Sequence, residues 1–121
     1  MKEKKTLVLG ASTKEDRYSN KAVRLLQQHN VPIVAVGNQE GEINGVQIQR
    51  NFPEHESIHT VTLYLSPKNQ EPYYDKILNL KPERIIFNPG TENPEFEKEL
   101  ASNGIQTDEA CTLVLLHTNA F

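Results

Sequence analysis

The loop after the first apolar run contains the groups best suited to hold a phosphate. Residues 7–23 read "LVLGASTKEDRYSNKAV". Gly10 allows a sharp turn and a close approach of the backbone to a ligand, and the helix expected next presents amide N–H groups to an anion. Ser12 and Thr13 add hydroxyl donors, and Arg17 adds a guanidinium that can grip phosphate with two hydrogen bonds. An ordinary strand-to-helix turn with solvated charges is the alternative for this stretch.

The loop lacks the glycine pattern of a standard dinucleotide site. That pattern, G-x-G-x-x-G, would require glycine at positions 10, 12 and 15, whereas the chain has Gly10, Ser12 and Glu15. An acidic residue is also expected at the end of the second strand to hold a ribose hydroxyl. Gly37 and Asn38 stand there instead. The sequence therefore disfavours an NAD site and leaves open a phosphate site built on another loop.

Two further motifs suggest chemistry that their surroundings do not support. "HESIH" at residues 55–59 matches H-E-x-x-H, which binds zinc when both histidines share one face of a stable helix and a third ligand is present. Here it lies between a hairpin and a strand, so we predict a connecting segment and no metal site. Cys111 has no histidine partner in sequence and is predicted to be a small buried residue. No paired carboxylates call for acid–base chemistry, and we predict no catalytic residue.

Apolar runs alternate with helical patterns along the whole chain. Strands are expected at residues 6–10, 32–37, 60–66, 83–88 and 105–107, and helices at 19–30, 69–80, 93–104 and 108–119. Ser19 or Asn20 is expected to cap the first helix and Asn93 the third, while Asn44-Gly45 predicts a hairpin over residues 42–48. This order predicts an α/β fold with a five-stranded, mostly parallel sheet in one domain over residues 1–121.

Ligands of open parallel sheets bind beyond the carboxyl ends of the strands, where the strand order reverses. The residues expected there are those that close the apolar runs. They are Gly10, Ala11 and Ser12 after the first strand, Gly37 and Asn38 after the second, Ser66 and Pro67 after the third, and Asn88, Pro89 and Gly90 after the fourth.

Composition limits the class of protein. Hydrophobic residues make up 36% and charged residues 24% of the 121 residues, as in a globular domain. The net charge of −3 argues against a nucleic-acid-binding surface. No apolar stretch approaches the roughly 20 residues that span a bilayer, and "MKEKK" is not followed by a signal-peptide pattern. A single cysteine fits a reducing compartment, so a cytoplasmic location is expected.

The motifs in their order resemble the small CoA-binding proteins. The shared features are Gly-Ala-Ser after the first strand, an Arg and a Ser before the first helix, "VPIVAVG", an I-x-G hairpin, "RIIFNPGTENPEFEKELASNGI" and "DEACTL", within roughly residues 5 to 116. This family has a single Rossmann-like domain, a three-layer α/β/α arrangement similar to the N-terminal domain of the succinyl-CoA synthetase α subunit. The phosphorylated histidine of the synthetase belongs to a further domain that this chain lacks.

The resemblance implies that the chain binds CoA or an acyl-CoA and catalyses nothing on its own. Gly10, Ala11, Ser12 and Arg17 would bind phosphate, and Gly37 and Asn38 would lie near the adenosine. Ser66 and Pro67 would line the cleft, with Asn88, Pro89 and Gly90 as its floor. Two alternatives remain. One is a small enzyme acting on a nucleotide-like substrate. The other is an interaction module without a ligand, because Gly37-Asn38-Gln39 and Asn88 depart from the family's pattern at the cleft.

Overall fold

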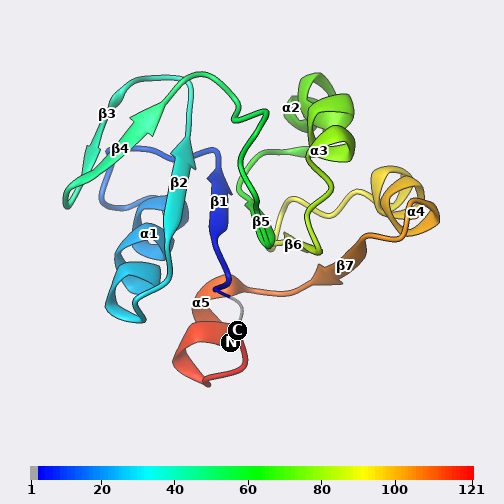
Figure 1. Cartoon of the computed structure of the whole chain (residues 1–121). Coiled ribbons are helices and arrows are strands. Elements are labelled where there is room, and N and C mark those ends of the chain that lie inside the picture. The colour runs from blue at the N-terminus through cyan, green and yellow to red at the C-terminus, as the bar shows by residue number, and fades with distance from the viewer. Residues whose placement is uncertain (1–2) are drawn as a thin grey trace.

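A central sheet separates two layers of helices in the computed structural model, which describes residues 3–121 (Figure 1). The strands are β1 (Thr6–Leu9), β2 (Ile33–Val36), β3 (Gly41–Ile43), β4 (Val46–Gln49), β5 (Thr60–Leu63), β6 (Arg84–Phe87) and β7 (Gln106–Glu109). The helices are α1 (Tyr18–Gln28), α2 (Pro67–Gln70), η1 (Glu71–Tyr73), α3 (Tyr74–Leu80), α4 (Pro94–Ser102) and α5 (Thr112–His117). The strand order is β3-β4-β2-β1-β5-β6-β7, and all the pairs are parallel except β3 with β4. The expected Rossmann-like α/β fold is confirmed; residues 1 and 2 of the expected domain lie outside the described residues.

The sheet has seven strands, and the expectation of five was wrong. The hairpin predicted at Asn44-Gly45 forms, with both residues at positive φ (47° and 91°). It does not stand apart from the sheet, because β4 pairs with β2 through Ala35↔Ile48 and Val36↔Gln49. The turn signal is local and readable in the sequence, whereas the pairing of β4 with β2 depends on contacts across the fold.

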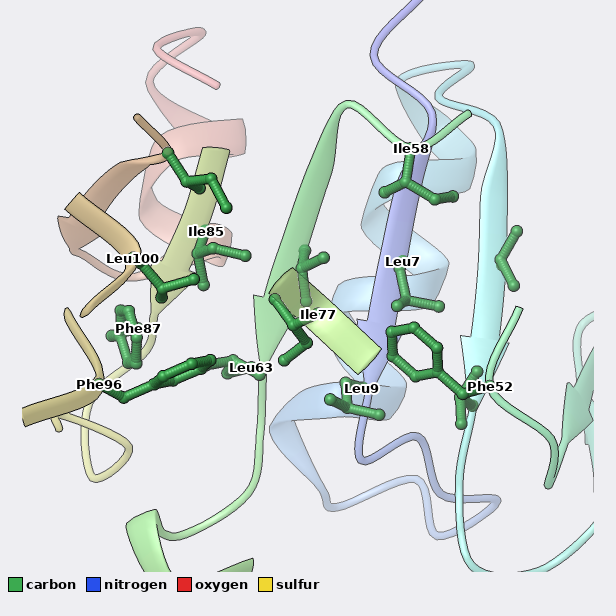
Figure 2. Close-up of a cluster of buried hydrophobic side chains, with 14 residues drawn as sticks. Leu7, Leu9, Phe52, Ile58, Leu63, Ile77, Ile85, Phe87, Phe96 and Leu100 are labelled. Atoms are coloured by element: carbon green, nitrogen blue, oxygen red, sulfur yellow. The ribbon is translucent and has the colours of Figure 1, made fainter. Parts of the chain in front are cut away.

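The two faces of the sheet bury different side chains because neighbouring residues of a strand point to opposite sides. Leu7 and Leu9 of β1 belong to the core beneath α3 and α4, which Figure 2 shows together with Phe52, Ile77 and Phe96. Val8 points the other way, into the core beneath α1 and α5. Side chains of β1 therefore belong to both cores. This packing on both faces fixes β1, the strand that precedes the loop of residues 10–17, here called the phosphate loop.

The helix ends agree with the sequence in one case and differ in another. The Asn93 side chain accepts a hydrogen bond from Phe96 N at 3.1 Å, and Pro94 begins α4, as predicted. The predicted cap of α1 was wrong, because the helix begins at Tyr18 and its N-cap is Arg17, which makes no side-chain capping bond. Ser19 and Asn20 are instead buried in the first turn of α1.

Two other helices are shorter than expected. The helix predicted over residues 69–80 is divided into α2, η1 and α3. Pro72 lies in η1 and lacks the amide that a continuous helix would need there. The last helix begins at Thr112 rather than 108, because residues 106–109 pair with β6 as β7.

The segment 55–59, "HESIH", contains no helix, so its histidines do not share a helical face. His59 lies with its Nε2 3.2 Å from a Glu83 carboxylate oxygen. Within residues 3–121, no group of three or more histidine, cysteine or acidic side chains is arranged to hold a metal ion. None of the helices in the same part of the chain is long and apolar enough to cross a membrane.

Candidate functional site

The strand order reverses between β1 and β5, and two neighbouring cavities lie at the carboxyl ends of these strands. On one side of this point the sheet continues from β1 to β2, and on the other side it continues from β5 to β6. The larger cavity, about 330 Å³, is here called the loop cavity, and the second, about 280 Å³, the central cavity. Such a switch point is where open α/β sheets bind their ligands.

Both cavities are built from loops that follow the strands. The loop cavity is lined by Gly10, Ala11, Ser12, Thr13, Lys14, Arg17, Val36, Gly37, Asn38, Gln39, Tyr64, Leu65 and Tyr73. The central cavity is lined by Gly10, Ser12, Arg17, Tyr18, Ser19, Tyr64, Leu65, Ser66, Pro89, Gly90 and Thr91. The structure therefore brings together most of the predicted site residues from four separate loops.

Two glycines allow the loop after β1 to lie against the rest of the sheet. Gly10 has φ +100°, and a Cβ there would stand 3.0 Å from Tyr64 O. A Cβ on Gly37 would stand 2.2 Å from Ala11 O, far inside van der Waals contact. The amides of Gly10 and Ala11 both donate to Val36 O at 2.9 Å. Any side chain at Gly37 would therefore push the loop away from β2.

The buried Asn20 ties the same loop to α1. Its Nδ2 donates to Ser12 O at 2.9 Å, and its Oδ1 accepts from Arg24 Nε at 2.8 Å. The Ser12 hydroxyl accepts from Lys14 N at 3.2 Å. Asn20, expected only as a helix cap, is thus a positioning residue that holds the loop in shape.

Donors without protein partners face this region. Among residues 3–121, the amides of Ser12, Thr13, Tyr18 and Ser19 have no protein acceptor. The exposed guanidinium of Arg17 has no ion-pair or hydrogen-bond partner in the same part of the chain. Unpaired amides at a helix start combined with a free cation make an anion-binding site.

The charged side chains that line the two cavities are cationic. Arg17 and Lys14 line the loop cavity, whereas no aspartate, glutamate or histidine among the described residues lines either cavity. The nearby Arg24, in contrast to Arg17, forms an ion pair: its Nη2 lies 3.6 Å from a Glu15 carboxylate oxygen.

Asn88 has a different environment from the one expected of a cleft floor. It is 3% exposed, and its Nδ2 donates to Thr62 Oγ1 at 2.7 Å and to Leu63 O at 2.8 Å. Its Oδ1 accepts from Thr112 N at 2.9 Å. These bonds use the polar atoms of the side chain, so Asn88 joins β5, β6 and α5. Pro67 lines neither cavity and begins α2.

Sequence reasoning missed Tyr64, whose ring lines both cavities. Tyr64 was placed inside a strand over residues 60–66, but β5 ends at Leu63. Burial is the main cause that raises the pKa of Tyr64 to about 12, although side-chain hydrogen bonds with Thr62 and Thr112 act in the opposite direction. The phenol is therefore neutral at physiological pH. Leu65, Gln39 and Tyr18 were missed as well, and nothing in their local pattern marks them.

Fold and site together define a Rossmann-like α/β protein with its ligand cavities at the carboxyl edge of the sheet. Residues 4–117 match the family described as the CoA binding domain, and the chain belongs to this family. No curated protein sequence matches the chain.

Solved structures share the fold over nearly the whole chain. The crystal structure of an uncharacterized protein is 45% identical, covers 100% of both chains and superimposes with a TM-score of 0.95. A protein from Thermus thermophilus is 24% identical over 98% of this chain and 91% of its own, with a TM-score of 0.86. A hypothetical protein from Pyrococcus horikoshii OT3 is 22% identical over 98% of this chain and 84% of its own, also with a TM-score of 0.86.

Proposed function

We propose that this protein binds CoA or an acyl-CoA at the switch point of its sheet and catalyses no reaction alone. The observation that carries the proposal is the set of unpaired donors along the two cavities: the amides of Ser12 and Thr13, those of Tyr18 and Ser19 at the start of α1, and the Arg17 guanidinium. A pyrophosphate or a 3′-phosphate supplies the anionic oxygens that such donors lack. Membership of the CoA binding domain family supports CoA as the source of these phosphates.

The lining of the cavities supports binding without catalysis. A general acid or base must lie within hydrogen-bond reach of the reacting group. The described residues that line the loop and central cavities include no carboxylate or imidazole, and burial raises the pKa of Tyr64 to about 12, which makes its phenol a weaker acid than usual. The protein is therefore expected to hold its ligand intact.

The test is isothermal titration calorimetry with CoA, dephospho-CoA and NAD. A bidentate charge-assisted contact contributes about 1.5–3 kcal/mol, so Arg17→Ala should weaken CoA binding roughly 10- to 100-fold. Arg17→Lys should restore part of this loss, because an ammonium cannot form the two-pronged contact. If Arg17 holds the 3′-phosphate, its removal should matter little for dephospho-CoA. If it holds the pyrophosphate, the loss should persist.

Lys98→Ala serves as the matched control, because it removes one positive charge from the exposed side of α4, away from both cavities. Its CoA affinity should equal that of the wild type. Binding of NAD without binding of CoA would overturn the proposed ligand. Protein-dependent release of free thiol from acyl-CoA, followed with a thiol reagent, would overturn the absence of catalysis.

A further inference from the structure

A third cavity adjoins the first two and differs from them in chemistry. This tyrosine cavity, about 220 Å³, is lined by Tyr18, Tyr64, Asn88, Pro89, Cys111 and Leu113. All six side chains are uncharged, and five of them present rings, aliphatic carbon or a thiol. An apolar hollow beside a cationic cavity suits a ligand that has an anionic end and an apolar end.

The tyrosine cavity is continuous with the other two. Tyr64 lines all three cavities, and Tyr18 and Pro89 are shared with the central cavity. Tyr64 directly follows β5, and its amide donates to Leu9 O at 2.9 Å, which fixes its backbone against β1. A ligand held by its phosphates at Arg17 can thus extend over the Tyr64 ring into a preformed apolar space.

Apolar side chains are left exposed around this space. Tyr18, the first residue of α1, is 67% exposed, and Leu113 at the start of α5 is half-buried. Figure 1 shows α1 and α5 on the same side of the sheet, and the two helices are in contact. Covering these side chains with an apolar group removes hydrocarbon surface from water, which is favourable.

We infer that the tyrosine cavity takes the acyl chain of a short aliphatic acyl-CoA, an inference that rests on the proposed function. CoA carries its phosphates at one end and its thioester at the other, and the pantetheine arm between them would occupy the central cavity, which shares lining residues with both of the other cavities. The Asn88 side chain is already satisfied by β5 and α5, and no cation lines the space among the described residues, so a carboxylate on the acyl group finds no cationic partner there to offset its desolvation. One water occupies roughly 30 Å³ in the liquid, so the volume has room for a chain of a few carbons.

The test compares butyryl-CoA, acetyl-CoA and succinyl-CoA by calorimetry. Butyryl-CoA has two more methylenes than acetyl-CoA, and each buried methylene strengthens binding by about fourfold. Butyryl-CoA should therefore bind about fifteenfold more tightly than acetyl-CoA, and succinyl-CoA should bind no more tightly than acetyl-CoA. In Leu113→Ser, the ratio of butyryl-CoA to acetyl-CoA affinity should fall to about three or less.

Val114→Ser is the matched control, because Val114 is 56% exposed on the same helix and lies outside the cavity lining. Its affinity ratio should stay at the wild-type value. If Leu113→Ser does not fold, Tyr18→Ser changes an exposed residue of the same cavity and gives the same readout. Tight binding of CoA with equal affinity for butyryl-CoA and acetyl-CoA would overturn the acyl site while leaving the proposed function intact. If neither CoA nor its esters bind, both proposals fail.

Discussion

Replacing Gly37 with alanine should separate the phosphate loop from β2. A Cβ at this position stands 2.2 Å from Ala11 O, and both atoms belong to backbone-fixed positions, so no rotamer change relieves the contact. The loop must move by about 1 Å to reach ordinary van der Waals distance. That shift strains three hydrogen bonds: Gly10 N and Ala11 N to Val36 O, and Gly37 N to Gln49 O. At about 1 kcal/mol each, loss of two or three of these bonds costs about 2–3 kcal/mol of unfolding free energy.

Urea unfolding followed by circular dichroism measures this loss, and Gly45→Ala is the control. Gly45 has φ +91° but open space around its Cα, so alanine there costs only the left-handed backbone penalty of about 1 kcal/mol. Gly37 carries no such penalty, and the loss at this position arises mainly from the contact with the Ala11 backbone, with Ile48 Cγ2 at 3.1 Å as a second, softer contact. The displaced loop should also bind CoA more weakly. If Gly37→Ala unfolds at the same urea concentration as the wild type, the close approach of the loop to β2 is not a constraint and the reasoning fails.

Two further predictions concern the polar side chains of Asn88 and Glu97. Asn88→Ala should lower the unfolding free energy by about 2–4 kcal/mol, because it leaves the buried Thr112 amide without its acceptor and removes two other hydrogen bonds. Exposed Asn38→Ala should change it by less than about 0.5 kcal/mol, and equal stability of the two variants would contradict the connecting role of Asn88. Burial, together with Glu109 nearby, raises the pKa of Glu97 despite its hydrogen bond from Asn93 N. Because the folded state disfavours the ionised form, the contribution of Glu97 to stability falls as pH rises through the acidic range. Glu97→Gln should therefore raise the melting temperature at pH 7 and lose this advantage near pH 4, whereas a gain that is constant with pH would contradict the assignment.

The limits of sequence reasoning are clear at Tyr64. The run "TVTLYLS" is apolar and β-branched to its end, so the sequence placed Tyr64 within a strand. Pairing with β1 and β6 stops at Leu63, and this pairing depends on where the neighbouring strands end. Because the expected strand ran three residues too far, Tyr64 was not recognised as a residue of the loop beyond β5, where it lines all three cavities.

Asn88 illustrates the same limit in another way. Its place after an apolar run and before Pro89 predicted a residue at the carboxyl edge of the sheet, and it lies there. Whether its amide faces a ligand or the protein depends on Thr62 and Thr112, which lie 26 and 24 residues away from it along the chain. No local pattern encodes those contacts.

The sequence alone determined what depends on neighbouring residues. The pattern of the apolar side chains indicated five of the parallel strands and the helices between them, Asn93-Pro94 marked the start of α4, and Gly10 with Arg17 marked the loop. The tertiary structure decided what depends on residues far apart in the chain. It added β3 and β4 to the sheet, set Gly37 against Ala11, and placed α5 beside α1 so that Leu113 and Tyr18 enclose one apolar space. Local propensity acts over a few residues, whereas packing and strand pairing join surfaces that only the folded chain brings together.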